Sequence, residues 1–154
     1  MAAKIKTGKF SIVRDAEIGE GTVIWHHCNI YGCRIGKNCK IGSYVEIGSS
    51  VKIGDNCKIE AFAFICSGVL IADEVFIGPH VTFINDKYPR AVGGWEVIPT
   101  TVKKGASIGA NTTLLCGITI GENSLIAAGS TVTKDVPPNA WVAGNPARPM
   151  VKKV

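Results

Sequence analysis

Three histidines and one amide–carboxylate pair are the side chains of this 154-residue chain best suited to move a proton or orient a reacting group. A neutral imidazole is a general base near neutral pH, and the candidates are His26, His27 and His80. The alternative for His80 is a surface or interface histidine. Asn85 and Asp86 follow His80 closely in the chain. An amide can orient a neutral amine without taking its proton, although Asn and Asp also form plain turns.

Basic residues and cysteines complete the set of candidate groups. Lys87 and Arg90 could bind a diphosphate or a carboxylate, or they could be solvated loop charges. The formal charge of +5 suits an anionic small molecule as well as a soluble surface. The six cysteines include no CxxC pair, which argues against a zinc ribbon or a redox motif, and we expect reduced thiols in a cytoplasmic protein. No metal is expected, because His26 and His27 are adjacent and far from His80.

A six-residue repeat must position these side chains. Isoleucine recurs every six residues, except for one spacing of five residues between Ile30 and Ile35. After a break, the six-residue spacing of aliphatic residues resumes from Val102 to Val132. The first series is Ile12, Ile18, Ile24, Ile30, Ile35, Ile41, Ile47, Ile53, Ile59, Ile65, Ile71 and Ile77. Neither a helix nor an alternating strand has this period, whereas a coil with three flat sides does. Each hexapeptide is then one short strand and a corner, with the aliphatic side chain inward.

The glycine that often follows the aliphatic residue should take backbone angles that a side chain forbids. A small or β-branched residue comes four positions after the aliphatic one. Cys28, Cys39 and Cys57 occupy this position, so we interpret them as small buried residues. Stacked coils should align Ile18, Ile35, Ile53 and Ile71 on one side, and Ile24, Ile41, Ile59 and Ile77 on the next.

The fold predicted from this pattern is all-β: a parallel β-helix of about six triangular coils in a single domain, residues 1–154. The coils cover about 12–83 and 102–137, and a short tail covers 138–154. The intervening segment, about 84–101, fits no hexapeptide, and Tyr88 and Trp95 argue against disorder. We expect an extruded loop that packs on a neighbouring subunit. No apolar run is long enough for a membrane span or a signal peptide, so we expect no membrane insertion. A nucleic-acid partner is not expected either.

The repeats from Ile12 to Val136 and two C-terminal motifs resemble the left-handed β-helix acyltransferase superfamily. These motifs are Asp135-Val136-Pro137-Pro138 and Ala143-Gly144-Asn145-Pro146-Ala147. Other segments are similar to N-acetyltransferases that act on nucleotide-linked 3-amino sugars and make surface polysaccharide precursors. These segments are Ile24-Trp25-His26, the run 83–90, and Pro99-Thr100 leading to Lys103-Lys104-Gly105-Ala106. The resemblance implies the left hand, a homotrimer with active sites between prisms, and acetyl-CoA lying along the prism as co-substrate.

The resemblance also assigns roles to residues. It implies pantetheine contacts from the backbone of Gly109, Ala110, Ala128 and Gly129, and phosphate contacts from Lys134 and Arg148. Asn145 belongs to the same cofactor-binding end. The catalytic candidates are Asn85, which orients the amine, Asp86 and His80. Family members of this kind often lack an evident base, and the leaving thiolate then accepts the proton. His26, Lys87 and Arg90 are expected to contact the nucleotide-sugar substrate, which is long enough to reach His26 three coils away.

Three other functions remain open. O-acetylation of a sugar hydroxyl would need a real base, so His80 distinguishes it from N-acetylation. A zinc carbonic anhydrase on this fold would need three convergent histidines. A non-catalytic scaffold is disfavoured by the loop and by the Gly144-Asn145-Pro146-Ala147 turn. The nucleotide and the sugar are not specified.

Overall fold

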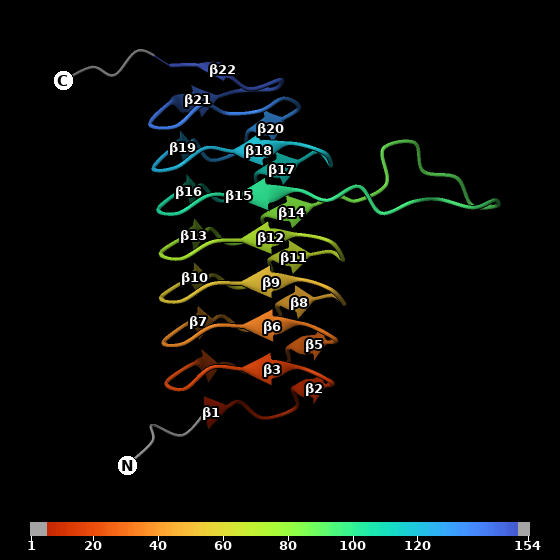
Figure 1. The fold of residues 1–154 in the computed structure, drawn as a ribbon, viewed down its shortest axis with the longest axis vertical. Helices are drawn as coiled ribbons and strands as arrows, with labels where there is room; N and C mark the ends of the chain where they lie inside the picture. Colours follow the sequence, from red (N-terminus) through yellow and green to blue (C-terminus); the bar gives the residue numbers. More distant parts are fainter. Residues whose placement is uncertain (1–5, 151–154) are drawn as a thin grey trace.

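A computed structural model describes residues 6–150 as a prism whose three faces are sheets of short strands (Figure 1). No helix occurs in this range. The nine-stranded face, here sheet A, contains β1 (Lys6–Thr7), β4 (Val23–Ile24), β7 (Lys40–Ile41), β10 (Lys58–Ile59), β13 (Phe76–Ile77), β16 (Ser107–Ile108), β19 (Leu125–Ile126), β21 (Trp141–Ala143) and β22 (Arg148–Pro149).

The other two faces carry seven and six strands. Sheet B contains β2 (Ile12–Arg14), β5 (Asn29–Tyr31), β8 (Glu46–Ile47), β11 (Phe64–Ile65), β14 (Thr82–Phe83), β17 (Thr113–Leu114) and β20 (Thr131–Val132). Sheet C contains β3 (Glu17–Ile18), β6 (Arg34–Ile35), β9 (Lys52–Ile53), β12 (Leu70–Ile71), β15 (Thr101–Val102) and β18 (Thr119–Ile120). The chain visits A, B and C in turn, so the edges of the prism are an A–B, a B–C and a C–A corner.

The stacking register confirms both predicted isoleucine ladders. Ile18 pairs with Ile35, which pairs with Ile53 and then Ile71 in sheet C. The second ladder, from Ile24 to Ile77, runs up sheet A in the same way. These side chains are buried in one continuous core, apart from the partly buried Ile18. Burying an isoleucine stabilises the fold by roughly 1.5–3 kcal/mol. Because each hexapeptide buries one aliphatic side chain, every repeat adds to the stability of the prism.

The first coil differs from the prediction. Val13, not Ile12, pairs with Ile30, and Ile12 is 63% exposed on the outer side of sheet B. The step of five therefore occurs twice, from Val13 to Ile18 and from Ile30 to Ile35. The two adjacent aliphatic residues at 12 and 13 both suit an inward position, and only the pairing with the next coil distinguishes them.

Glycines after the aliphatic residue have a different role from the one predicted. Gly78 and Gly109 do not have positive φ; instead, a Cβ at Gly109 would lie 2.5 Å from the Ala128 backbone nitrogen. Close approach of successive coils is the reason for glycine here. The left-handed backbone occurs two residues later, for example at His80 (φ 57°) and Asn111 (φ 56°).

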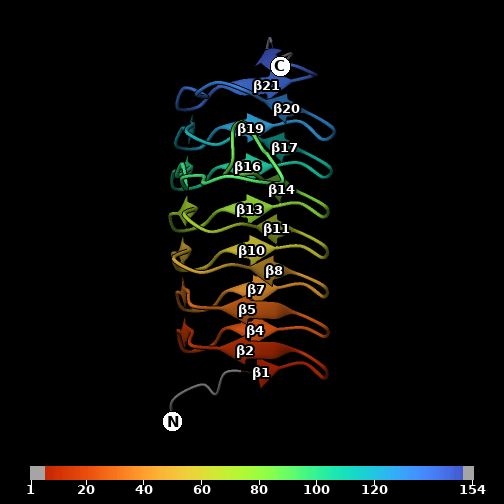
Figure 2. The ribbon, with the colours of Figure 1, turned by 90° about the vertical axis from the view of Figure 1, so that its right-hand side faces the viewer.

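The prism is longer than the expected six coils at both ends. The tail from 138 does not leave the prism at once, because β21 stacks parallel on β19 and β22 folds back antiparallel to it. An isolated bridge between Ile120 and Val136 continues sheet C below it. The loop between Phe83 and Thr101 projects from the B–C corner, well away from the prism (Figures 1 and 2). No helix among the described residues is long and apolar enough to cross a membrane.

Candidate functional site

The A–B corner brings several of the predicted residues into one line. His80 lies at the corner after β13, and the next two coils place 109–110 and then 128–129 above it. The links are direct: Asn111 N donates to Pro79 O (2.9 Å), and Gly129 N donates to Ala110 O (2.8 Å). The candidate base and the expected pantetheine-binding backbone therefore occupy consecutive levels of one edge.

His80 also ends a column of stacked aromatic rings along this corner. The Phe62 and His80 rings are 4.8 Å apart at an interplanar angle of 3°, and Tyr44 and His27 continue the stack at the same spacing. Phe10 ends it at 5.2 Å from His27. All five residues have positive φ, a strained backbone for bulky side chains. The column fixes the plane of the His80 ring.

His26 lies beside this column, three coils below the level of His80, as the repeat predicts. Its Nδ1 accepts a hydrogen bond from the backbone nitrogen of Lys9 (2.9 Å). A neutral His26 imidazole therefore carries its proton on Nε2, which is left as a donor.

The loop base at the B–C corner holds Asn85. Its Nδ2 donates to Ser67 O (3.1 Å), and its backbone oxygen accepts from Ile98 N (3.2 Å). Asn85 is half-buried: its side chain anchors the start of the loop to the coil below, and its backbone oxygen holds the returning arm. Because Nδ2 is used, Oδ1 is the atom left to accept a hydrogen bond.

Two glycines make room for the loop base. Gly68 and Gly117 flank it in the coils below and above, both with positive φ (88° and 76°). A side chain at Gly68 would meet Val97, and one at Gly117 would lie 3.0 Å from Ile98. The returning arm therefore packs closely against the prism, which gives Asn85 a rigid support.

The other loop residues predicted to act make only local contacts. Asp86 Oδ1 accepts from Tyr88 N (3.0 Å), which is the turn-forming alternative. Lys87 Nζ lies 5.7 Å from the Tyr88 ring centroid, and Arg90 donates to the carbonyl of Pro89. Asp86 and Lys87 line a hollow of about 330 Å³ on the loop together with Trp95.

The C-terminal end brings Lys134 and Arg148 together. Both line one hollow of about 170 Å³, together with Asp135, Pro137 and Ala147. Arg148 Nη1 donates to Ala147 O (2.9 Å), and both cationic residues are exposed. Asn145 is exposed in the turn between β21 and β22. The arrangement is suitable for a multiply charged anion.

One chain does not bring His80 and Asn85 together. They lie at opposite edges of sheet B, because β14 (Thr82–Phe83) separates the A–B corner from the B–C corner. A substrate that contacts both residues must therefore lie between two chains, or the two residues do not share a substrate.

The thiols are structural. All six cysteines are free and buried, as predicted for Cys28, Cys39 and Cys57. Burial raises the pKa of the Cys33 and Cys66 thiols to about 11, which keeps both protonated near neutral pH. Hydrogen bonding with the Cys57 thiol lowers the pKa of Cys39, but the buried Cys39 Sγ donates to Gly54 O (3.2 Å). Within residues 6–150, no three His, Cys, Asp or Glu side chains cluster in a way that could hold a metal ion.

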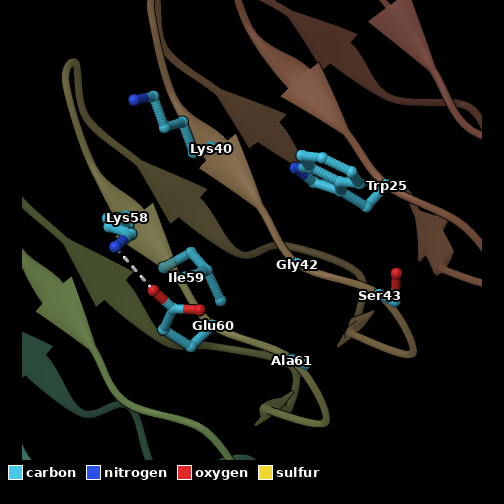
Figure 3. A pocket seen from close by; sticks show the side chains of 8 residues that line it. All are labelled: Trp25, Lys40, Gly42, Ser43, Lys58, Ile59, Glu60 and Ala61. Atoms are coloured by element: carbon cyan, nitrogen blue, oxygen red, sulfur yellow. Dashed lines mark ion pairs between the residues drawn. The ribbon is translucent and has the colours of Figure 1, made fainter.

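Sequence reasoning missed a hollow of about 340 Å³ on sheet A, bounded by Trp25 and the Lys58–Glu60 ion pair (Figure 3). The signal for it was present in the repeat. Trp25 and Glu60 occupy the position after the inward aliphatic, which in neighbouring coils belongs to Gly42 and Gly78. Large side chains at a position that is otherwise glycine project from the sheet and form the walls of the hollow.

Comparison with known proteins agrees with this architecture. The family model "Bacterial transferase hexapeptide (six repeats)" matches residues 15–49, 32–67, 50–85 and 99–134. The chain belongs to the hexapeptide transferase family. The gap between the last two matches contains the loop, so the family pattern accounts for the prism and not for the insertion.

Relatives of this hexapeptide transferase include sugar acetyltransferases. A dTDP-3-amino-3,6-dideoxy-alpha-D-galactopyranose 3-N-acetyltransferase of Aneurinibacillus thermoaerophilus is 45% identical over 49 residues, which are 32% of this chain and 26% of that protein. The structure of a maltose O-acetyltransferase from Clostridium difficile 630 is 28% identical with a TM-score of 0.61, covering 71% of this chain and 67% of that one.

A GDP-perosamine N-acetyl transferase variant from Caulobacter crescentus, in complex with CoA and GDP-perosamine, has the same fold at 19% identity and a TM-score of 0.68. The alignment covers 99% of this chain but 59% of that one. The chain therefore spans less than two thirds of the length of this protein and of the Aneurinibacillus relative.

Proposed function

We propose that this hexapeptide transferase is an acetyl-CoA-dependent N-acetyltransferase that acts on a nucleotide-linked amino sugar in surface polysaccharide biosynthesis. The observation that carries the proposal is the match of 45% identity to a dTDP-amino-sugar N-acetyltransferase. The extruded loop with Asn85 at its base supports it, because N-acetylation needs a hydrogen-bonding side chain that orients the neutral amine of the substrate.

The active form is proposed to be a homotrimer with sites between neighbouring prisms. The separation of His80 and Asn85 across sheet B supports this, because a loop that projects from the B–C corner can reach the A–B corner of another copy. In this arrangement the site receives Asn85, Asp86, Lys87 and Arg90 from one copy. His80 comes from the adjacent copy.

Acetyl-CoA is proposed to lie along the A–B corner. The pantetheine then contacts the backbone of Gly109, Ala110, Ala128 and Gly129. Its phosphates reach the C-terminal end of a chain, where Lys134 and Arg148 share one hollow and Asn145 lies close by in sequence. Charge-assisted contacts of this kind are about twice as strong as neutral hydrogen bonds.

The reaction follows from the orientation of Asn85. Its Nδ2 is bound to Ser67, so Oδ1 accepts an N–H of the neutral amine and directs the nitrogen lone pair to the thioester carbonyl. The new C–N bond forms as the C–S bond breaks, and the departing thiolate takes the amine proton. His80 donates or accepts a hydrogen bond at the edge of the site and is not required as the base.

O-acetylation of a sugar hydroxyl is the second candidate, favoured by the maltose O-acetyltransferase structure at 28% identity. A hydroxyl keeps its proton near neutral pH, so this reaction needs His80 as a general base. The column of rings that fixes the His80 plane would serve that role as well.

One assay distinguishes N-acetylation from O-acetylation. Thiol release from acetyl-CoA is measured with a panel of UDP-, dTDP- and GDP-linked amino sugars and with the matching sugars that carry hydroxyl in place of the amine. The expected result is turnover of at least one amino sugar and a product that releases free sugar amine only on deacetylation. Turnover of the hydroxyl sugars alone would assign the second candidate.

A further inference from the structure

The hollow on sheet A has the composition of a ligand site and no role in the chemistry described above. It lies on sheet A, in coils below the level of His80, and Figure 3 shows its lining. Trp25 forms one wall, and the ion pair between Lys58 Nζ and Glu60 Oε1 (2.8 Å) forms the other. Its lining is Trp25, Lys40, Gly42, Ser43, Lys58, Ile59, Glu60 and Ala61.

The hollow exists because small residues separate two large ones. Trp25 projects over the next coil, where Gly42 and Ser43 leave the floor open, and Glu60 rises from the coil after that. Trp25 is 53% exposed, with an edge contact to the His26 ring. An indole this exposed presents a flat apolar face to whatever enters the hollow.

Two ammonium groups project from the same face. Lys58 Nζ is paired with Glu60 and lies 5.7 Å from the Phe76 ring centroid, which fixes its position. Lys40 lies in the adjacent strand and takes part in no ion pair among residues 6–150. An ammonium has three donors, so Lys58 can bond Glu60 and still contact an anion. A flat aromatic face next to two cations is suited to a planar ring that carries phosphates.

The hollow adjoins the coil that carries His80. Ala61 lines the hollow, and its carbonyl accepts a hydrogen bond from His80 N (3.1 Å). The Trp25 and His80 levels are separated by three coils, and the ring column shows that each step is 4.8 Å. A base at the Trp25 level, a diphosphate beside Lys40 and Lys58 on sheet A and a sugar at the His80 level would follow one another along the prism axis.

We propose that the hollow binds the nucleoside diphosphate part of the acceptor, with the base on the Trp25 indole and the diphosphate between Lys40 and Lys58. The inference rests on the proposed function, because it assumes an acceptor linked to a nucleotide. Glu60 holds Lys58 in place but repels phosphate. Its negative charge therefore limits how tightly the nucleotide-linked product is retained.

The test is calorimetric titration of the whole protein, saturated with acetyl-CoA, with UDP, dTDP and GDP as probes. Trp25→Ala and Lys40→Ala should each raise the Kd of the best probe about tenfold, and Trp25→Phe should restore most of the affinity. Glu60→Gln should lower this Kd. Lys52→Ala, an exposed lysine on sheet C, is the matched control and should change nothing. The Kd of acetyl-CoA should stay within twofold of wild type in every variant.

Wild-type binding of a nucleoside diphosphate that is unchanged by Trp25→Ala and by Lys40→Ala would overturn the inference and leave the proposed function intact. No binding of any of the three probes to the wild-type complex would count against the nucleotide-linked acceptor itself. The inference would then fall with it.

Discussion

At the scale of single residues, we expect alanine substitutions of Asn85 and His80 to affect kcat to very different extents. Asn85 is held by Ser67 through Nδ2, so its Oδ1 is pre-oriented, whereas the His80 ring is fixed by stacking on Phe62. If the acceptor is an amine, Asn85→Ala should lower kcat about a hundredfold to a thousandfold, as for the loss of one positioned contact worth about 2.7–4 kcal/mol. His80→Ala should cost much less, because the thiolate takes the proton.

The measurement is kcat for both variants, with the oligomeric state and the unfolding midpoint checked in each. Asn85 also bridges the loop base, so Asn85→Asp is a useful companion that keeps the size of the side chain. A nearly inactive His80→Ala beside an almost unaffected Asn85→Ala would reverse the two roles. That result would assign O-acetylation, because a hydroxyl acceptor needs a general base.

The sequence predicted these candidates but not how they are held. His26 was selected for its place in a motif, yet His27 is the residue that stacks in the column with His80. The column depends on which corner position has positive φ in each coil, and spacing along the chain does not reveal this. The sequence allows Asp86 to be a reacting group or a turn former, and the hydrogen bond from Tyr88 N to its Oδ1 is that of a turn.

At the scale of elements, the hexapeptide period predicted the ladders because each strand buries one aliphatic residue in a fixed register. The period failed to predict the structure where a strand has no hexapeptide pattern, or where two adjacent residues both fit the inward position. Ile12 and Val13 are both aliphatic, and β21 has no hexapeptide signature although Val142 stacks on Ile126. The loop was located because it interrupts the period, but its packing against Gly68 and Gly117 depends on tertiary contacts.

The close approach of coils predicts the effect of one methyl group. In Gly109→Ala the new Cβ would lie 2.5 Å from Ala128 N and 2.9 Å from Ala128 Cα, both backbone atoms that cannot rotate away. The coils must separate locally, and we expect a loss of about 1–3 kcal/mol in unfolding free energy. Denaturant unfolding at fixed protein concentration measures it.

Gly94→Ala is the matched control, because no atom lies within 4 Å of a Cβ at this loop position. Its stability should equal that of the wild type. Equal stability of Gly109→Ala would show that successive coils are less tightly stacked than the structure indicates. Since Gly109 is also proposed to contact pantetheine, the variant should weaken acetyl-CoA binding as well.

At the scale of the whole molecule, the three faces differ in polarity. Sheet C presents Glu17, Arg34 and Lys52 outward, and Arg34 Nε pairs with Glu17 Oε2 at 2.7 Å. Sheet B and the A–B corner are more apolar at the surface. Their exposed large hydrophobic residues include Phe10, Ile12, Val13, Tyr44, Phe62 and Phe64. Phe76, at the outward position of β13 in sheet A, is half-buried, with Lys58 Nζ over its ring.

An apolar face of this kind marks an interface, and the proposed site is incomplete without a second copy. We therefore predict a homotrimer in which sheet B and the A–B corner face the neighbours. Sedimentation equilibrium at micromolar concentration should give three times the mass of one chain. Phe64→Asp, on the outer side of sheet B, should dissociate the trimer and abolish activity, because a buried unpaired charge at an interface is strongly unfavourable.

Leu70→Asp on sheet C is the matched control for this change. Leu70 and Phe64 are exposed to similar extents (37% and 40%) and both lie at the outward position of a two-residue strand. The Leu70 variant should remain trimeric and active, since its charge stays in solvent. If both variants remain trimeric, sheet B is not the interface. If the wild type sediments as a monomer, His80 and Asn85 have no route to a common substrate, and the mechanism proposed for Asn85 must be rebuilt within a single chain.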